Sequence, residues 1–187
     1  MLRVLHIVTI SLVGIFSLTA QVVTSPFRTS TMDPEIRTLV VPKWENGSLL
    51  AFSVNPPRVY ASDDAGHLRF RIEISPPGAE RVELTDMSAA PNGKFAVAGT
   101  GYGAGGAYAQ FLAWLAPDGR VEKFVNVENA GIVAICFGPD NSLWTLVREF
   151  GSSVDFKEAK NYDLIRRYDD NGKLTGTMLP RDLFPAR

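Results

Sequence analysis

A short turn motif that recurs at a fixed interval is the feature that most constrains this chain. Gly66, Gly119 and Gly172 are spaced 53 residues apart. Each glycine closes a turn between two strand-like runs, and a hairpin position that needs a positive φ suits a residue without a side chain. The matching stretches are 64–68, 117–121 and 170–174. A repeat of this length predicts one supersecondary unit per copy, with units that stack on one another.

A second turn precedes the first in every unit, at 46–49, 91–95 and 139–143. In the third unit the two turns and a polar loop between them separate four short strand-like runs, at 132–137, 143–147, 162–168 and 173–179. Four short strands joined by turns form an antiparallel meander, the structure of one propeller blade. The sequence therefore predicts an all-β fold, a partial (open) β-propeller of about three four-stranded antiparallel blades. We place these blades at about 36–75, 80–128 and 131–180, with the first strand at 36–41 and its turn at 42–47.

The loop between the second and third strands lengthens from unit to unit. In a propeller these loops lie on one face, opposite the hairpin turns, and variable loops on a rigid scaffold are where binding usually occurs. Tolerated insertions would produce the same pattern. If the loops bind, the candidate contact residues are Tyr102 and Tyr108 beside the glycine-rich stretch, and Arg148 and Asp155 at the longest polar loop.

The first twenty residues have the layout of a secretory signal peptide. Arg3 precedes an apolar run over 4–18, and Ala20 offers a small residue for cleavage. We therefore expect a signal helix over 1–20, an extended lead-in over 21–35, and a secreted or periplasmic protein. The alternative is an uncleaved membrane anchor, and we expect this segment to be the only part of the chain that contacts a membrane.

Charge and cysteine content exclude several classes of protein. The net charge is −1 and acidic and basic residues are interspersed, so we expect no nucleic-acid partner. The single cysteine, Cys136, cannot form an internal disulfide and lies in an apolar run. We expect it to be a buried core residue.

Two motifs resemble cofactor sites, and both have simpler explanations. The glycine-rich stretch 100–106 would need a following helix to cradle phosphates, but the next run is strand-like. The pairs Asp63–Asp64 and Asp169–Asp170 offer oxygen ligands for Ca²⁺ or another divalent metal. Both pairs precede a repeat glycine, where aspartate suits the turn itself. We therefore expect no cofactor and no catalytic residue, with a divalent metal as the alternative.

Two stretches, 115–121 and 137–144, carry a resemblance to a known class of propellers. Over about 36–179 the chain resembles six-bladed propellers of the NHL-repeat and gluconolactonase-like type. The lactonase branch implies a metal in the central channel, held by Glu, Asn and Asp from several blades. A cluster of such residues around the inner strands would favour an enzyme; its candidates are Glu83, Asp86, Asn126, Glu128 and Asn129.

The leading hypothesis is a propeller-type module that binds a ligand or protein and is not an enzyme by itself. The alternative is a fragment of a metal-dependent lactonase-like or lyase-like propeller enzyme. Closed propellers have about 4–8 blades, so three leave apolar faces open on the first and third units. We expect these faces to be covered by further blades of a longer protein or by a second copy, and we favour the longer protein.

Overall fold

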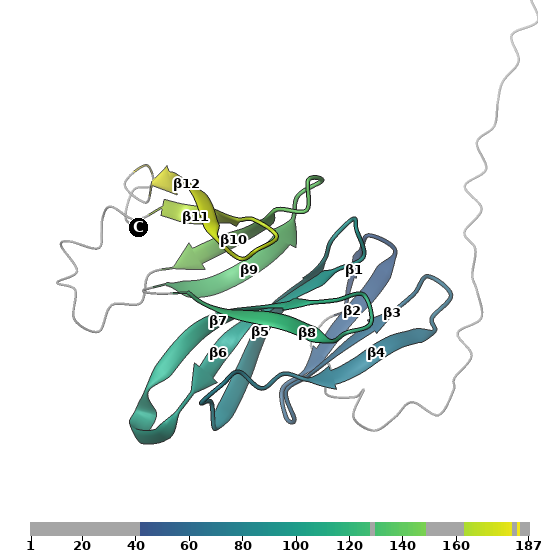
Figure 1. Ribbon diagram of the computed structural model, residues 1–187, viewed down its shortest axis with the longest axis horizontal. Helices are drawn as coiled ribbons and strands as arrows, with labels where there is room; N and C mark the ends of the chain where they lie inside the picture. Colours follow the sequence, from purple (N-terminus) through teal and green to yellow (C-terminus); the bar gives the residue numbers. More distant parts are fainter. Residues whose placement is uncertain (1–41, 128–129, 149–162, 181–182, 184–187) are drawn as a thin grey trace, which may run out of the picture. The chain divides into compact units, whose positions relative to one another are not determined.

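The computed structural model describes residues 42–127, 130–148, 163–180 and 183 (Figure 1). These residues form three four-stranded antiparallel sheets and contain no α-helix; the short 3-10 turn η2 spans Ala104–Gly106. The predicted all-β fold is therefore confirmed. The signal peptide, the lead-in and the strand expected at 36–41 lie outside the described residues.

Each sheet is built from strands in the order in which they follow along the chain. Blade 1 contains β1 (Lys43–Glu45), β2 (Ser48–Ser53), β3 (Arg58–Ser62) and β4 (Leu68–Glu73). Blade 2 contains β5 (Arg81–Ala89), β6 (Phe95–Tyr102), β7 (Tyr108–Leu115) and β8 (Val121–Val127). Blade 3 contains β9 (Gly131–Phe137), β10 (Leu143–Arg148), β11 (Asp163–Tyr168) and β12 (Leu174–Pro180). Three consecutive meanders are the arrangement of a partial, open propeller.

The three blades stack in sequence order, because β5 contacts β2 on one side and β9 on the other. We call the side of a blade toward the following blade its front face and the other side its back face. One apolar core joins the front face of blade 1 to the back face of blade 2, where Phe70 meets Phe95 edge-on at 4.9 Å between ring centroids. A second core joins blades 2 and 3, where Trp114 meets Tyr168 at 6.4 Å.

The repeat glycines occupy the same turn in all three blades. In each turn the glycine amide donates to the carbonyl three residues earlier, as from Gly119 to Ala116 at 2.9 Å. The φ angles of Gly66, Gly119 and Gly172 are 83°, 87° and 76°. A one-residue register shift follows at the same place in each blade, so the repeat predicted from the sequence extends to the hydrogen bonds and the β-bulge.

The first turn of blade 1 differs from its counterparts. Asn46 and Gly47 both have positive φ, at 46° and 69°, and the flanking residues Glu45 and Ser48 pair directly. This is the two-residue turn that an Asn-Gly pair favours, whereas blades 2 and 3 use three-residue turns. The shorter turn leaves room for strand β1 at 43–45, where the sequence predicted a turn over 42–47.

Cys136 is exposed, so the prediction of a buried core cysteine is wrong. The residue alternates onto the front face of blade 3, where it pairs across the strands with Trp144. No described blade covers that face, and an apolar strand therefore carries an accessible thiol.

Candidate functional site

The loops that vary along the chain lie on the face opposite the hairpin turns. In blade 2 the β6–β7 loop is at one end of the sheet and the β5–β6 and β7–β8 turns are at the other (Figure 1). The corresponding loops are 54–57 in blade 1 and 149–162 in blade 3, and the last lies outside the described residues. We call this side of the blades the loop face.

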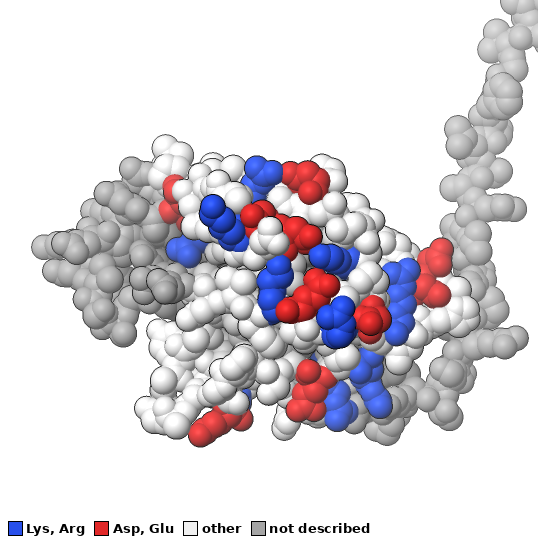
Figure 2. All heavy atoms as spheres, in the orientation of Figure 1, with Lys and Arg blue, Asp and Glu red and all other residues white. Residues whose placement is uncertain are grey.

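A hollow of about 340 Å³ opens on the loop face of blade 2. It is lined by the linker 76–79 between blades 1 and 2, by Gly101 and Gly103, and by residues 107–111 and 124–126. None of these lining residues carries a charge, and Figure 2 shows a mostly uncharged surface around the β6–β7 loop. We call this site the tyrosine hollow, after Tyr108, which is 52% exposed.

Two glycines allow the linker to approach the end of β6. A Cβ atom on Gly103 would lie 3.1 Å from the carbonyl oxygen of Gly78, and one on Gly101 would lie 3.2 Å from the Ala79 Cβ. Close packing therefore accounts for part of the glycine-rich stretch. Strand β7 follows this stretch instead of a helix, so the geometry of a phosphate cradle is not formed.

Two aromatic rings and one buried amide are among the residues that line the tyrosine hollow. Phe111 and Phe124 meet edge-on at 5.9 Å between centroids. The amide of Gln110, a residue 8% exposed, donates to Thr100 Oγ1 at 2.6 Å and accepts from the Ile132 amide at 3.3 Å. Because both ends of the Gln110 amide are engaged, Gln110 ties β7 to β6 and to blade 3.

A second hollow of about 400 Å³ adjoins the first and shares Ala79 with it. It lies where the loops of blade 1 meet the start of β5, and its charged lining residues are Glu73, Glu80, Arg81 and Glu83. The Arg81 guanidinium lies 3.0 Å from Glu83 Oε1, so part of this charge is already paired. The two hollows therefore differ sharply in charge.

Tyr102 lines neither of these hollows, although it pairs across the strands with Tyr108. Its hydroxyl donates to Glu83 Oε2 at 2.8 Å, and Arg81 lies over its ring at 4.1 Å. The hydrogen bond to the Glu83 carboxylate raises the pKa of Tyr102, and burial raises it further. Arg148 ends β10 on blade 3, and Asp155 lies outside the described residues. Of the four candidates, Tyr108 lines the tyrosine hollow, and Tyr102 lines neither of the two hollows described above.

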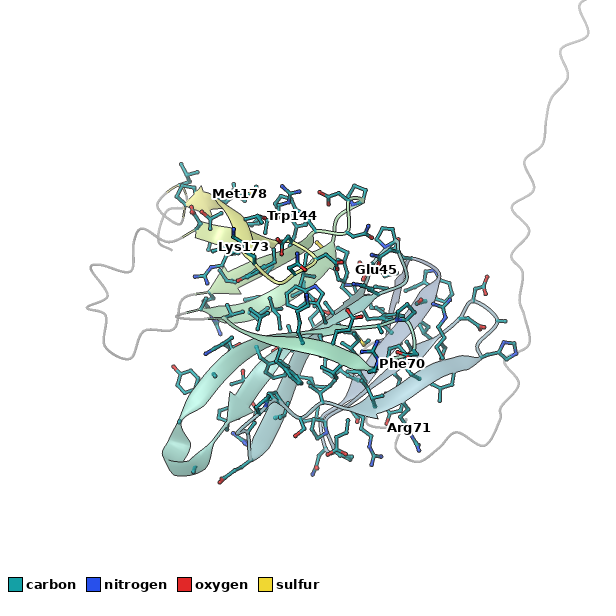
Figure 3. All side chains as sticks on the ribbon, in the orientation of Figure 1. Glu45, Phe70, Arg71, Trp144, Lys173 and Met178 are labelled. Carbon is teal, nitrogen blue, oxygen red and sulfur yellow. The ribbon has the colours of Figure 1, made fainter. Side chains whose placement is uncertain are left out.

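The inner strands β1, β5 and β9 are joined by a polar network that the sequence analysis missed. On β1, Lys43 Nζ donates to the carbonyls of Met87 at 3.3 Å and Ile135 at 3.1 Å. Glu45, labelled in Figure 3, accepts from Ser88 Oγ at 2.9 Å and from the Ala89 amide at 3.3 Å. Side chains of blade 1 therefore bond the inner strand of blade 2.

Blade 2 repeats the arrangement toward blade 3. Asp86 accepts from the Ile135 amide at 2.8 Å, and Ser88 Oγ accepts from the Phe137 amide at 3.0 Å. We call these contacts the inner-strand clamps. The sequence did carry a signal for these clamps: two polar residues, two positions apart, shortly before the first turn of a blade. They are Lys43 and Glu45 in blade 1, and Asp86 and Ser88 in blade 2.

The residues proposed to mark an enzyme are dispersed. Asp86 is engaged in a clamp, Glu83 accepts from Tyr102, and Asn126 lines the tyrosine hollow. Glu128 and Asn129 lie outside the described residues. Among the described residues no group of three or more His, Cys, Asp or Glu is placed to hold a metal ion.

One carboxylate of each aspartate pair, Asp63 and Asp169, bonds its own turn, whereas Asp170 accepts from Lys94 of blade 2 at 3.0 Å. Asp63 accepts from the His67 amide at 2.8 Å, and this bond is the main cause that lowers the pKa of Asp63. Asp169 accepts from the amides of Asn171 and Lys173, both at 2.9 Å. These bonds are those of aspartate at a turn.

No protein-family model matches the chain, and no curated protein matches its sequence. Similar solved structures include a protein of unknown function from Bacteroides caccae, 15% identical, and a glucose dehydrogenase, 18% identical, each with a TM-score of 0.42. Each comparison covers 72% of this chain, but only 42% of the first protein and 44% of the second. The chain therefore spans less than half of either protein, and neither likeness bears on its function. No helix among the described residues is long and apolar enough to cross a membrane.

Proposed function

We propose that the chain is a secreted or periplasmic binding module of the NHL-like propeller type, which takes up a neutral ligand or protein segment on its loop face. The uncharged tyrosine hollow beside the half-exposed Tyr108 is the observation that carries this proposal. The lengthening of the loops on that face agrees with it.

The lining of the hollow indicates the chemistry of the ligand. Its volume of about 340 Å³ lies within the range of small-molecule sites, about 300–1,000 Å³. Aromatic and proline side chains suit the flat apolar face of a ring, and the Asn126 amide can orient a hydroxyl or carbonyl at its edge. A charged ligand would lose its hydration here with no opposite charge in the lining to compensate. We therefore propose a neutral, ring-bearing ligand.

A titration followed by heteronuclear NMR tests this proposal. The probes are a neutral hexose, a proline-rich decapeptide and inorganic phosphate, each added to the full chain. We expect one of the neutral probes to cause saturable shifts at 76–79 and 107–111, and phosphate to cause none. Tyr108→Ala should weaken binding about tenfold, because the ligand loses roughly 1.4 kcal/mol of aromatic contact.

Trp44→Ala is the matched control, since Trp44 is an aromatic residue of similar exposure, 56%, on blade 1. This variant should bind the neutral probe as the unmodified chain does. Shifts that do not saturate, or equal weakening by both variants, would overturn the tyrosine hollow as the binding site. Binding of phosphate alone would overturn the neutral ligand class.

A further inference from the structure

One ammonium group contacts the inner strands of all three blades. Lys43 lies on β1, and its Nζ donates to the carbonyl of Met87 on β5 at 3.3 Å and to that of Ile135 on β9 at 3.1 Å. Glu45 Oε2 lies 3.3 Å from the same nitrogen. An ammonium has three N–H groups, and these three oxygens offer one acceptor for each. Lys43 therefore joins blade 1 directly to blade 3, across 92 positions of the sequence.

Asp86 brings a second negative charge beside this ammonium. Its Oδ2 lies 3.9 Å from Lys43 Nζ and accepts from the Ile135 amide at 2.8 Å. Its Oδ1 accepts from the Met87 amide at 2.8 Å. Met87 and Ile135 are thus each held twice, through the amide by Asp86 and through the carbonyl by Lys43. The cation and this carboxylate therefore act on the same two strands.

The charged side chains of this group are partly shielded from water. The side chain of Lys43 is 38% exposed, that of Glu45 is 16% exposed and that of Asp86 is 22% exposed. Charges that are partly buried are screened less by water and salt than exposed ones. Two carboxylates in such a place are stabilised by a positive charge close to both, and Lys43 supplies that charge from within the chain.

A divalent metal ion at the inner strands, which the resemblance to lactonases implies, does not fit these residues. An ion such as Ca²⁺ takes 6–8 oxygen ligands. Here both oxygens of Glu45 already accept hydrogen bonds from blade 2, and both oxygens of Asp86 accept from backbone amides. The Lys43 ammonium also lies within 4 Å of both carboxylates, and its charge would repel a second cation.

We propose that the Lys43 ammonium takes the place of a metal ion at the inner strands, so that the three blades are tied there by a cation that the chain itself supplies. Folding is then independent of divalent ions at this place. The metal-dependent enzyme considered as the alternative would have to bind its ion away from Lys43, Glu45 and Asp86. This inference does not depend on the proposed ligand site.

Urea unfolding of the full chain tests the proposal. The folding equilibrium constant of the unmodified chain should be the same in Ca²⁺, in a chelator and in plain buffer. Lys43→Met keeps an apolar stem but removes the charge and the donors, so it should lower this constant by about tenfold or more. Lys43→Arg keeps the charge and should lower the constant by less than about threefold.

Lys173→Met is the matched control, because Lys173, labelled in Figure 3, is an exposed lysine in the β11–β12 turn. Removing its charge should change the folding equilibrium constant by no more than about twofold. If Lys43→Met is no more harmful than this control, the ammonium does not hold the blades and the proposal is wrong. It is also wrong if Lys43→Arg is as harmful as Lys43→Met, because a positive charge is then not what these strands require.

Heteronuclear NMR of the unmodified chain shows whether an ion binds at the inner strands. Adding Ca²⁺ should cause no saturable shift of the amides at 86–89 and 134–137. Saturable shifts there, or a rise in the urea midpoint with Ca²⁺, would mean that the inner strands take a metal ion in addition to Lys43, and would overturn the proposal. This arm uses the unmodified chain, so it decides the question even if Lys43→Met fails to fold.

Discussion

Replacing Gly119 by alanine separates the cost of the turn's backbone from the cost of the contact between blades. Gly119 has a φ of 87°, in the left-handed region where a side chain costs roughly 1–2 kcal/mol. Its Cβ would also lie 2.5 Å from Phe70 Cγ and 2.8 Å from Phe70 Cβ. Phe70 is 6% exposed and packs against Phe95, so it cannot turn away from the added methyl group.

The repeat supplies a control with the same backbone and no neighbour. Gly66 has a φ of 83° in an equivalent turn, and a Cβ there would meet nothing within 4 Å. Gly66→Ala should therefore lower the free energy of unfolding by about 1–2 kcal/mol, the backbone cost alone. Gly119→Ala should lower it by about 1–3 kcal/mol more, the usual cost of overpacking a well-packed core.

Urea unfolding at low protein concentration measures both variants, with the free energy taken from the midpoint and the slope. Gly172→Ala should behave like Gly119→Ala, because its Cβ would lie 2.6 Å from Val125 Cγ2. Equal losses in Gly66→Ala and Gly119→Ala would refute the reasoning, since the contact between blades would then contribute nothing.

Two further predictions concern carboxylates. Asp86→Ala should lower the free energy of unfolding by about 1–3 kcal/mol, because the amide of Ile135, which is 3% exposed, loses its acceptor. Urea unfolding should show a smaller loss for Asp86→Asn, because asparagine keeps an oxygen that can accept this bond. The pKa of Asp140 is lowered from 3.8 to about 2, first by the Ser142 hydroxyl and amide and then by Arg167. This carboxylate therefore stabilises the fold above about pH 4 and loses that contribution as the pH falls toward 2. The gap in urea midpoint between the unmodified chain and Asp140→Asn should close over that window, and a constant gap would contradict the assignment.

The blades could be predicted because their signals are local. Alternation of apolar residues and the chemistry of each turn act within a few residues, and the repeat at Gly66, Gly119 and Gly172 tests them three times. The shorter turn at Asn46 and Gly47 shows the limit of this reasoning. The same Asn-Gly pair occurs in turns of two and three residues, and the flanking strand pairing decides between them.

The candidate site was only partly predictable. Tyr108 lies in the tyrosine hollow, but its sequence neighbour in the same motif, Tyr102, is held by Glu83 on β5. Which tyrosine is accessible depends on a strand almost twenty residues earlier in the chain. The sequence pattern of Cys136 is that of a buried strand, but its side chain is exposed on the front face of blade 3, which no described blade covers.

From its sequence alone this chain determines three antiparallel meanders, the positions of their turns and the identity of the face that carries the variable loops. The tertiary structure decides what meets across the blades: the clamps from Lys43/Glu45 and Asp86/Ser88, the contact of Gly119 with Phe70, and the tyrosine hollow between linker and loop. The physical reason is distance along the chain. Strand and turn preferences act between neighbours, whereas these contacts join residues more than twenty positions apart, whose meeting depends on the stacking of whole sheets.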